Sequence, residues 1–438
     1  MLISAGESTV CCRQWRLAAW ELIQLTIDSD LRYFVIHFPE PLAPKSQITL
    51  GISYNLLNSL SPRPAAISQA ERQFLSYSFS GYVHSAYPTL TQKTKLKFPS
   101  TKVPDFTGTT GLKSGSGPDP ERQGATYTYG PYDTSKVTPG TTYPLTVRYE
   151  FTKPVVTASL LERDLEVSHW GDNLATEERY WLRNNGSQLA KQFSRVEWTI
   201  SSYQQLPSSA LRDIKYPLKA GSVDPYFIDD VGNVSTSRYR PSKGAREANL
   251  ELRPRFPIFG GWNYSFRIGW NNQLSSFLRQ AATSAESYVL KVPFIEGPKN
   301  SEGIQYENVV VRVVLPEGAR NVRYEMAEGS KSNGLPGTNQ IQSELSTHKT
   351  YMDTLGRTVL TLKVENLSDE ARGSELVVSL LSCSFASQLI AYMLTIQITY
   401  DYSLWDALRK PFTITAGLLA VFAAAWSIGN IDVSIKKR

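Results

Sequence analysis

The sequence predicts a mainly β protein, with tandem β-sandwich-like domains followed by one C-terminal transmembrane helix. Short segments of branched and aromatic residues alternate with polar ones, which is typical of half-buried strands. Turn residues separate these segments, and regular strand–helix alternation is absent, which favours sandwiches over an α/β fold. One uncharged segment near the C terminus, residues 411–431, is long enough to cross a membrane.

The composition is that of an ordinary globular protein. The chain has 438 residues, 41% hydrophobic and 20% charged, enough for two or three domains with buried cores. Its 46 basic and 40 acidic residues are interspersed, whereas a nucleic-acid-binding protein concentrates its basic residues in a stripe. Cys11, Cys12 and Cys383 do not make a disulfide framework. We therefore expect stability from packing, and no nucleic-acid partner.

Residues 1–30 form an atypical N-terminal segment. A luminal body is expected to follow a signal peptide, which has a basic start and then an apolar run of about 7–15 residues. Charged residues interrupt the sequence here: Glu7, Arg13, Arg16 and Glu21. We therefore see no signal peptide. Either the start is incomplete, or insertion depends on the C-terminal span alone.

Residues 31–160 are predicted to form a first β domain, incomplete at its N terminus. Strand-like sequence begins at Phe34, and residues 145–151 alternate between apolar and polar side chains. Residues 107–120 are rich in Gly, Ser and Pro and are predicted to form a loop. This loop contains no glycine motif of the phosphate-binding kind.

Residues 161–403 are predicted to form a second β domain. Strands are expected at residues 309–315 and 358–364, and the alternation over residues 196–200 predicts another. Residues 253–262 predict a corner, where Gly260–Gly261 allows a sharp reversal.

Two segments of this domain depart from strand periodicity. Residues 210–219 fit a short helix or turn. Residues 274–288 show no period-2 alternation and are predicted to be helical.

The C-terminal uncharged segment, residues 411–431, is predicted to be a transmembrane helix. At a helical rise of 1.5 Å per residue it reaches about 30 Å, the thickness of the hydrocarbon core. A buried core helix would carry a polar face, but this segment has only scattered Thr, Ser and Gly. Residues 432–438 end in a basic cluster, which favours a cytosolic tail, although Arg409 and Lys410 make the charge difference small.

A second uncharged segment, residues 376–400, is longer than this span. By hydropathy alone it is another transmembrane candidate. If both segments crossed, only a short link would separate them, and the tail would return to the side of the body.

Four N-x-S/T sequons precede the C-terminal span and are candidate glycosylation sites: Asn185, Asn233, Asn263 and Asn366. A single triplet occurs by chance, but four upstream of one span are consistent with a body that faces a secretory lumen. These asparagines would accept glycans and take no part in catalysis.

Residues that could carry catalysis are scarce. The chain has no GxSxG or HExxH motif. Asp229–Asp230, with Glu178 or Glu251, could in principle form a glycosidase pair, but a turn before Gly232 is the favoured interpretation. The histidines lie outside any zinc spacing: His37, His84, His169 and His348. We therefore predict no catalytic residue, no metal site and no cofactor.

Several motifs together resemble the ribophorin I family, the alpha subunit of the eukaryotic oligosaccharyltransferase complex. The most specific is RPRFPIFGGW at residues 253–262. Residues 39–54 are similar to the fungal members, and the resemblance extends from about residue 31 to the C terminus. The other matching segments are residues 169–171, 193–195, 230–237, 314–319 and 351–357, and the terminal span.

The resemblance implies a single-pass type I protein of the endoplasmic reticulum with two luminal β-rich domains. The family's complex transfers a lipid-linked oligosaccharide to Asn of N-x-S/T, and a different, many-span subunit carries its catalytic WWD-type motif. No WWD occurs here. The implied role is accessory: organising the complex and guiding acceptor polypeptide.

The partners implied by the resemblance are the other subunits, the nascent polypeptide, the translocation machinery and membrane lipid. Two other functions remain open, a single-span chaperone or cargo receptor and a stand-alone luminal glycoside hydrolase.

The family has no counterpart of residues 379–397. We therefore hypothesise that this apolar insert is a retained intron or a gene-model artefact rather than a second span. Without it, the sequence on either side would form one strand that leads into the membrane helix.

Overall fold

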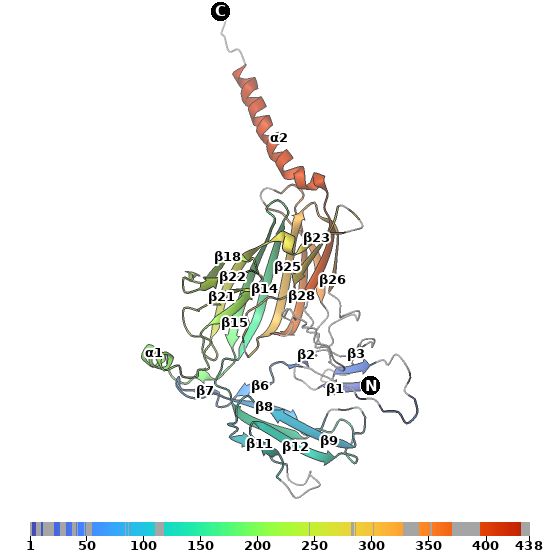
Figure 1. The fold of residues 1–438 in the computed structure, drawn as a ribbon, viewed down its shortest axis with the longest axis vertical. Coiled ribbons are helices and arrows are strands. Elements are labelled where there is room, and N and C mark those ends of the chain that lie inside the picture. The colour runs from blue at the N-terminus through green and yellow to red at the C-terminus, as the bar shows by residue number, and fades with distance from the viewer. Residues whose placement is uncertain are drawn as a thin grey trace, which may run out of the picture.

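The structure is a computed structural model that describes residues 55–83, 87–109, 118–244, 246–281, 286–300, 302–326, 341–350, 353–369 and 395–430. It also describes residues 85 and 284 and short segments at 2–5, 10–11, 22–26, 32–36, 41, 43–47 and 49. A smaller β body, a larger β body and the helix α2 (Leu404–Gly429) follow one another along the molecule (Figure 1). The predicted mainly β fold with a C-terminal apolar helix is confirmed.

The smaller body is built from two sheets that share one core. The first has the order β10-β13-β8-β6, with β6 (Leu60–Pro62), β8 (Phe74–Ser80), β10 (Asp105–Phe106) and β13 (Pro144–Glu150). The second has the order β11-β12-β9, with β9 (Thr91–Lys97), β11 (Glu121–Gln123) and β12 (Thr126–Asp133). Val147 of the first sheet and Tyr129 of the second are fully buried in the shared core. The alternation predicted for residues 145–151 is confirmed in β13.

The described segments at residues 2–5, 10–11, 22–26 and 32–36 are also strands. β4 pairs with two of them in the order β1-β4-β3, and β2 pairs with β5. Their bounds are β1 (Leu2–Ala5), β2 (Val10–Cys11), β3 (Leu22–Thr26), β4 (Arg32–Ile36) and β5 (Asn55–Leu56).

The larger body is organised on one long sheet with the order β19-β18-β22-β15-β14-β25-β28-β27. The central strands β14 and β25 run parallel, and the other neighbours are antiparallel. The bounds are β14 (Val156–Ser168), β15 (Asn173–Asn184), β18 (Val223–Asp229), β19 (Gly232–Asn233), β22 (Asn263–Gln273), β25 (Gln305–Glu317), β27 (Gln342–His348) and β28 (Arg357–Ser368).

Two smaller sheets cover one face of this long sheet. One has the order β17-β21-β20, with β17 (Ile214–Leu218), β20 (Arg238–Arg240) and β21 (Ala248–Leu252). The other has the order β23-β24-β29-β26, with β23 (Leu278–Gln280), β24 (Ser287–Pro293), β26 (Arg320–Met326) and β29 (Thr395–Asp401). Leu250 of β21 and Ile398 of β29 lie in one core with Leu161 and Val311 of the long sheet, which makes the larger body sandwich-like.

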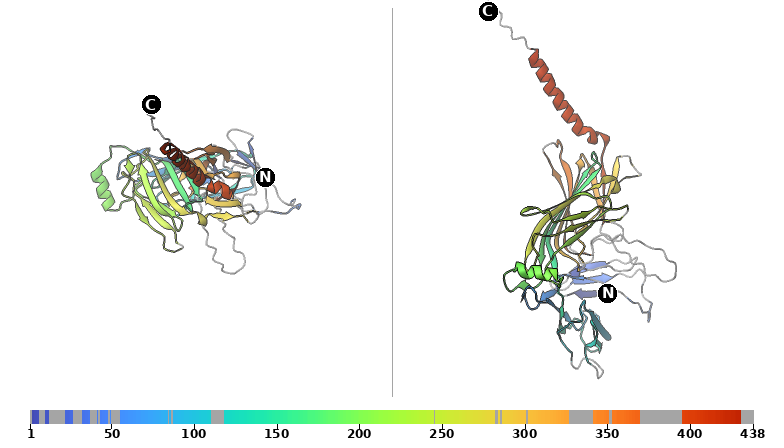
Figure 2. Two further views of the ribbon diagram at one scale, coloured as in Figure 1. Left: turned by 90° about the horizontal axis from the view of Figure 1, so that it is seen from above. Right: turned by 60° about the vertical axis from the view of Figure 1, so that its left-hand side comes forward.

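Strand ends from distant parts of the chain gather beneath α2. β14 and β25 both end there, at Ser168 and Glu317, and β28 begins there. β29 ends at Asp401 and leads directly into the helix. Figure 2 shows α2 leaving the larger body at the end opposite the smaller body.

One predicted strand is wrong. Residues 196–200 lie in a helix, α1 (Arg195–Tyr203), none of whose residues is buried. Its N-cap Ser194 accepts a hydrogen bond from the backbone N–H of Glu197, and Ser and Glu at this spacing form the signature of a capping box. α1 lies on the surface and packs through half-buried Trp198 on Phe259, so its apolar alternation does not indicate a strand.

The two helical predictions in this domain also differ from the structure. Within residues 274–288, the described residues include a single turn of 3₁₀ helix, η1 (Leu274–Ser276), and residues of β23 and β24. Residues 210–219 contain β17. In both places, pairing with a neighbouring strand outweighs the local pattern.

Other strand predictions are confirmed. Residues 309–315 lie in β25, and residues 358–364 lie in β28. The strand predicted to join the two sides of the insert stays a prediction, because residues 376–378 lie outside the described residues. Most of the insert at residues 379–397 lies outside the described residues. Its last residues, 395–397, begin β29.

Candidate functional site at the base of the membrane helix

The helix α2 starts on the body and extends away from it. Ser403 caps its N terminus by accepting a hydrogen bond from the backbone N–H of Asp406. The part apolar enough to cross a membrane is 0% buried within the body, so its side chains face outward. The predicted span at residues 411–431 lies in α2 or its C-cap as far as Asn430, and the helix begins earlier, at Leu404.

Pro411 lies inside α2 and changes the hydrogen bonding of the turn before it. Proline has no N–H, so the carbonyl of Ala407, four residues earlier, lacks its helical donor. Trp170, in the turn between β14 and β15, takes that place: its indole Nε1 donates to the Ala407 carbonyl oxygen at 2.8 Å. Figure 1 shows α2 bending near its base, as expected for a helix that contains proline.

Asp406 connects the first turn of α2 to the turn after β25. Its side chain is 6% exposed, and Arg320 Nη2 lies 3.2 Å from its Oδ1. Gly318 has a φ of +95°, and a Cβ there would lie 2.7 Å from the Asp406 carboxyl carbon. Position 318 therefore requires glycine for its backbone conformation and for the close approach of the helix.

Lys410 is held by two buried carboxylates. Its Nζ donates to Asp353 Oδ1 at 2.5 Å and lies 3.7 Å from Glu317 Oε2. Glu317 also accepts backbone hydrogen bonds from Thr354 and Leu355. Burial raises the pKa of both acids, but hydrogen bonds outweigh burial and lower both pKa values. Asp353 accepts from Lys410, and Glu317 accepts from residues 354 and 355. Both are therefore ionised at neutral pH.

His169 packs beneath α2 against three tyrosines. Its Nε2 lies 2.6 Å from the Tyr400 hydroxyl, and its ring contacts those of Tyr288 and Tyr402. Burial lowers the pKa of His169, so the ring is neutral at pH 7. In the described part of the chain, no three or more His, Cys, Asp or Glu side chains are grouped to hold a metal ion. The motif at residues 169–171 fastens the long sheet to the helix.

A second polar joint connects the smaller and larger bodies. β7 (Ala66–Ile67) pairs in parallel with β16 (Gln188–Leu189). Gln73 is 0% exposed beside this pair. Its Nε2 donates to the carbonyls of Phe151 and Lys153, and its Oε1 accepts from the backbone N–H of Ser187. One side chain thus satisfies backbone groups of both bodies.

The RPRFPIFGGW motif lies at this joint. Gly260 forms a parallel bridge with Gln188, and a Cβ on Gly260 would lie 2.1 Å from the Ser187 carbonyl oxygen. Gly261 has a φ of +80°, which confirms the predicted corner. Asn184 Nδ2 donates to the carbonyl of Ile258 at 3.0 Å. The motif therefore packs against residues 184–188, the segment that contacts the smaller body.

Asp229 and Asp230 form the predicted turn. Asp229 Oδ1 accepts from the backbone N–H of Gly232, and its Oδ2 pairs with Arg255 at 2.6 Å. Asp230 accepts instead from the hydroxyl of Ser265. The two carboxylates have different partners and different structural roles.

The other carboxylates considered for catalysis lie elsewhere. Glu178 is 0% exposed in the core, where it pairs with buried Arg163 and accepts from the Tyr180 hydroxyl. Glu296 lies 3.5 Å from Arg163, and burial raises its pKa although the guanidinium opposes this. Glu251 lies on β21, in another sheet. The structure does not bring these acids together with Asp229 and Asp230 in a cleft.

Of the four candidate acceptor asparagines, Asn233 and Asn263 are exposed. Asn185 and Asn366 are half-buried. Asn185 Nδ2 donates to the Thr157 hydroxyl, and Ser187, the third residue of that sequon, is 1% exposed at the joint. Asn366 lies on β28 with a φ of +58°.

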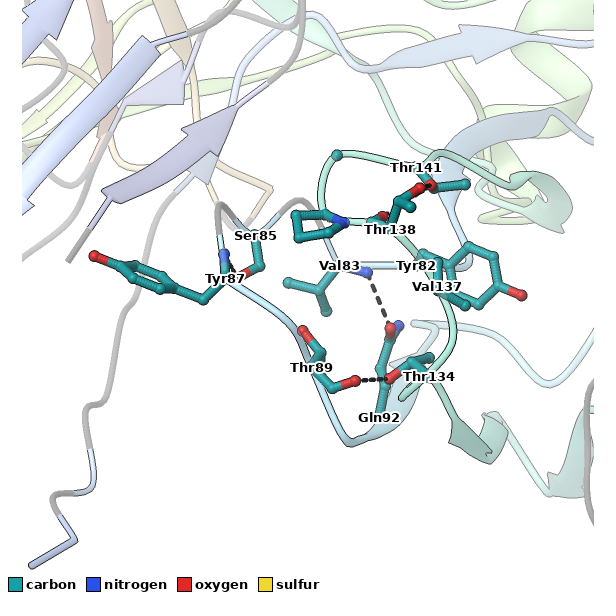
Figure 3. Close-up of a pocket in the computed structure, with 12 residues that line it drawn as sticks. Tyr82, Val83, Ser85, Tyr87, Thr89, Gln92, Thr134, Val137, Thr138 and Thr141 are labelled. Carbon is teal, nitrogen blue, oxygen red and sulfur yellow. Dashed lines mark hydrogen bonds between the residues drawn. The ribbon is translucent and has the colours of Figure 1, made fainter. Parts of the chain in front are cut away.

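The smaller body contains a small cavity and an open groove. The cavity has a volume of about 20 Å³, room for about one water, and the backbone N–H of Val83 donates to Gln92 Oε1 there (Figure 3). The groove, about 400 Å³, is lined by Leu60, Tyr77 and Phe98, among others. The described residues lining these two hollows include no acidic, histidine or cysteine side chain.

Taken together, a β body is fixed to an apolar helix through three turns of its sheets. Of the acids considered for catalysis, Asp229, Asp230 and Glu178 are held in structural contacts. These features define a membrane-anchored protein. The chain belongs to the ribophorin I family: the family profile described as "Ribophorin I" matches residues 18–429.

Three relatives agree with this membership. The chain is 30% identical over 414 residues to "Dolichyl-diphosphooligosaccharide--protein glycosyltransferase subunit 1B" of Arabidopsis thaliana, covering 94% of this chain and 77% of the relative. It is 30% identical over 408 residues to subunit 1 of the same name from Caenorhabditis elegans, covering 93% and 61%. It is 32% identical over 330 residues to subunit 1 from Schizosaccharomyces pombe, covering 75% and 68%.

Proposed function

We propose that this chain is subunit 1 of oligosaccharyltransferase, the complex that transfers a dolichol-linked oligosaccharide to asparagine in N-x-S/T of nascent polypeptides. It is an accessory, non-catalytic subunit that organises the complex and presents acceptor polypeptide. The names of the three relatives support this role, since each is subunit 1 of a dolichyl-diphosphooligosaccharide–protein glycosyltransferase.

The observation that carries the organising role is the fixed connection between the larger body and α2. A flexible linker would be enough to anchor an independent enzyme. Here β29 leads directly into α2, and Trp170, Asp406 and Lys410 join the helix to the body at successive points. Such a connection sets the direction of the body relative to the membrane, which a scaffold needs and a tether does not.

The body faces the lumen of the endoplasmic reticulum. α2 crosses the membrane once in the type I sense, and residues 432–438 form the cytosolic tail. The exposed sequons at Asn233 and Asn263 and the basic C-terminal residues support this orientation.

The partners are the other subunits, including the catalytic many-span subunit, together with the nascent polypeptide, the translocation machinery and membrane lipid. The chain is a fungal-type member, a proposal supported by the similarity of residues 39–54 to fungal members.

Two luminal β domains, residues 31–160 and 161–403, follow an atypical N-terminal segment, residues 1–30. The apolar insert at residues 379–397 is a retained intron or gene-model artefact. Sequencing the transcript across codons 374–403 tests this, because an uninterrupted message that encodes the insert excludes the idea.

The function is tested by native purification in mild detergent and identification of the co-purifying proteins. A fixed set of membrane subunits that includes the catalytic one is expected. A Gly318→Ala variant should lose part of that set, because the added Cβ displaces Asp406 and with it the helix. A Gly108→Ala variant is the matched control, because a Cβ there makes only an ordinary contact, 3.5 Å from Asp119 O.

Two results would overturn the proposal. Recovery of varied client proteins instead of a fixed set would indicate a chaperone or cargo receptor. Activity of the purified chain on glycans or acceptor peptides, without partner subunits, would indicate a stand-alone enzyme.

A further inference from the structure

Large apolar side chains surround the base of α2 on the surface of the larger body. Trp170 is 66% exposed, Leu355 is 54% exposed, and Leu404 and Trp405 are more than 70% exposed. Trp170 and Leu355 come from two different turns of the long sheet, and the other two come from the first turn of the helix. We call these four residues the collar.

The height of the collar along α2 follows from two contacts. Trp170 donates to the carbonyl of Ala407. Ala407 lies four residues before Pro411, where the uncharged segment begins, and four residues of helix span about 6 Å. The headgroup layer on each side of a bilayer is about 5–8 Å thick. If the hydrocarbon core begins at Pro411, Trp170 lies within the headgroup layer.

Leu355 is attached to the helix near the start of the uncharged segment. Its loop is tied to Lys410, the residue before Pro411, through Asp353 and Glu317. Its backbone N–H donates to Glu317 Oε1 at 2.6 Å, which fixes the loop backbone at Leu355.

We propose that the collar lies in the headgroup layer of the bilayer, so that the larger body rests on the membrane through two sheet turns as well as through its helix. This inference rests on the proposed crossing of the membrane by α2. The contact adds a lipid-binding surface to the body itself.

The chemistry of the collar fits lipid. Tryptophan is enriched at membrane interfaces, where its ring is apolar and its N–H finds a polar partner, as Trp170 does on Ala407. Arg320, 68% exposed at the start of β26, adds a cation to this surface beside its partner Asp406. The collar is also continuous with the outward apolar surface of α2, where Trp405 stacks on Phe412.

Fluorescence quenching of the full chain in phosphatidylcholine vesicles tests the proposal. The acyl chains carry bromine either near the headgroup or near the bilayer centre. The contribution of one tryptophan is the difference between the wild type and its Trp→Phe variant. Trp170→Phe reports on the collar, Trp426→Phe on the span, and Trp181→Phe, at the far end of β15, on the body away from the membrane. Leu355→Trp adds a second reporter, which remains informative if Trp170→Phe disturbs the junction.

We expect Trp170 and the tryptophan at position 355 to lose fluorescence with bromine near the headgroup, while Trp181 is unchanged. A second outcome is that bromine quenches Trp426 but neither collar reporter, and that aqueous iodide quenches both collar reporters. The collar then lies in water and the inference is wrong, while the proposed membrane crossing by α2 remains supported. That result would leave the collar for a protein partner. If Trp426 itself is not quenched, the proposed membrane crossing fails, and the inference fails with it.

Discussion

Trp170 donates to the carbonyl of Ala407, the carbonyl that Pro411 leaves without a helical donor. A residue in a turn of the long sheet thus completes the hydrogen bonding of a helix more than 200 residues later in the chain. The bend of α2 and its attachment to the body have a common origin in this pair.

The pair predicts energetic coupling between the two residues. Trp170→Phe leaves the Ala407 carbonyl without a donor, which costs about 1–3 kcal/mol in the local opening of residues 404–410. Pro411→Ala restores a backbone donor, so Trp170→Phe should cost less in that background. Hydrogen exchange of the first turns of α2 measures this double-mutant cycle, with Trp181→Phe as the control. Additive effects would show that the two residues do not share the carbonyl.

The acids that hold Lys410 predict a pH dependence. The pKa of Asp353 and that of Glu317 are lowered in the folded chain. The two ionised acids therefore stabilise the fold fully when the pH is above the ordinary carboxyl pKa of about 4. This contribution to the free energy of unfolding is lost as the pH falls towards the lowered pKa values. Asp353→Asn should lower the thermal unfolding midpoint at pH 7, and its difference from the wild type should shrink below about pH 4. An Asp105→Asn variant, at an exposed ion pair, should show little difference. A constant Asp353→Asn difference across this range would contradict the assignment.

The buried pair of Arg163 and Glu178 predicts a large loss of stability. Arg163→Met leaves two buried acids without their cation, and we expect a loss of about 3–5 kcal/mol in the free energy of unfolding. Arg179→Met, at the neighbouring register position with a side chain 43% exposed, should cost less than about 1 kcal/mol. Denaturant unfolding in detergent measures both. Equal losses would mean that the buried network is not the source of the effect.

The joint between the bodies predicts that Gly260→Ala loosens their contact. The new Cβ would meet the Ser187 carbonyl at 2.1 Å, so the backbone at the joint must move. Limited proteolysis should then cut the connection at residues 151–155 faster than in the wild type. A Gly108→Ala chain should be cut at the wild-type rate. Unchanged cleavage in Gly260→Ala would mean that the joint tolerates the shift.

The sequons predict unequal glycosylation. Asn233 and Asn263 are exposed and should carry glycans, whereas the half-buried Asn185 and Asn366 should be mostly unmodified in the folded protein. Glycopeptide mass spectrometry of the native protein measures the occupancy at each position. Asn233→Gln and Asn185→Gln provide a matched pair, of which only the first should lower the apparent mass. High glycan occupancy at Asn185 would contradict this prediction. It would mean that Asn185 is glycosylated before the two bodies fold together.

The sequence predicted several elements because they depend on local chemistry. The turn at Asp229 follows from an aspartate that accepts from the backbone ahead of a glycine, and the corner at Gly260–Gly261 follows from backbone freedom. The strand in residues 309–315 is a run of valines interrupted by Arg312 and ended by Leu315. The strand prediction for residues 196–200 is wrong because it rests on apolar alternation alone, whereas Ser194 and Glu197 carry the capping signal of α1.

The base of α2 could not be predicted in the same way. Pro411 alone indicates that one helix carbonyl needs a donor, but nothing near it in the sequence names Trp170. Asp353 and Glu317 are ordinary acids in the sequence, and they became the partners of Lys410 only because β25 and β28 end at the same edge. Glu178 was considered for catalysis until its burial against Arg163 showed a structural role.

The sequence by itself determined the mainly β class, the apolar helix and the family resemblance, because strand alternation, an uncharged run and a specific motif are properties of neighbouring residues. Only the tertiary structure decided how the helix is held and what the motif does. The contacts of Trp170 with Ala407 and of Gly260 with Ser187 join residues far apart in the chain, and their geometry depends on the register of the strands between them.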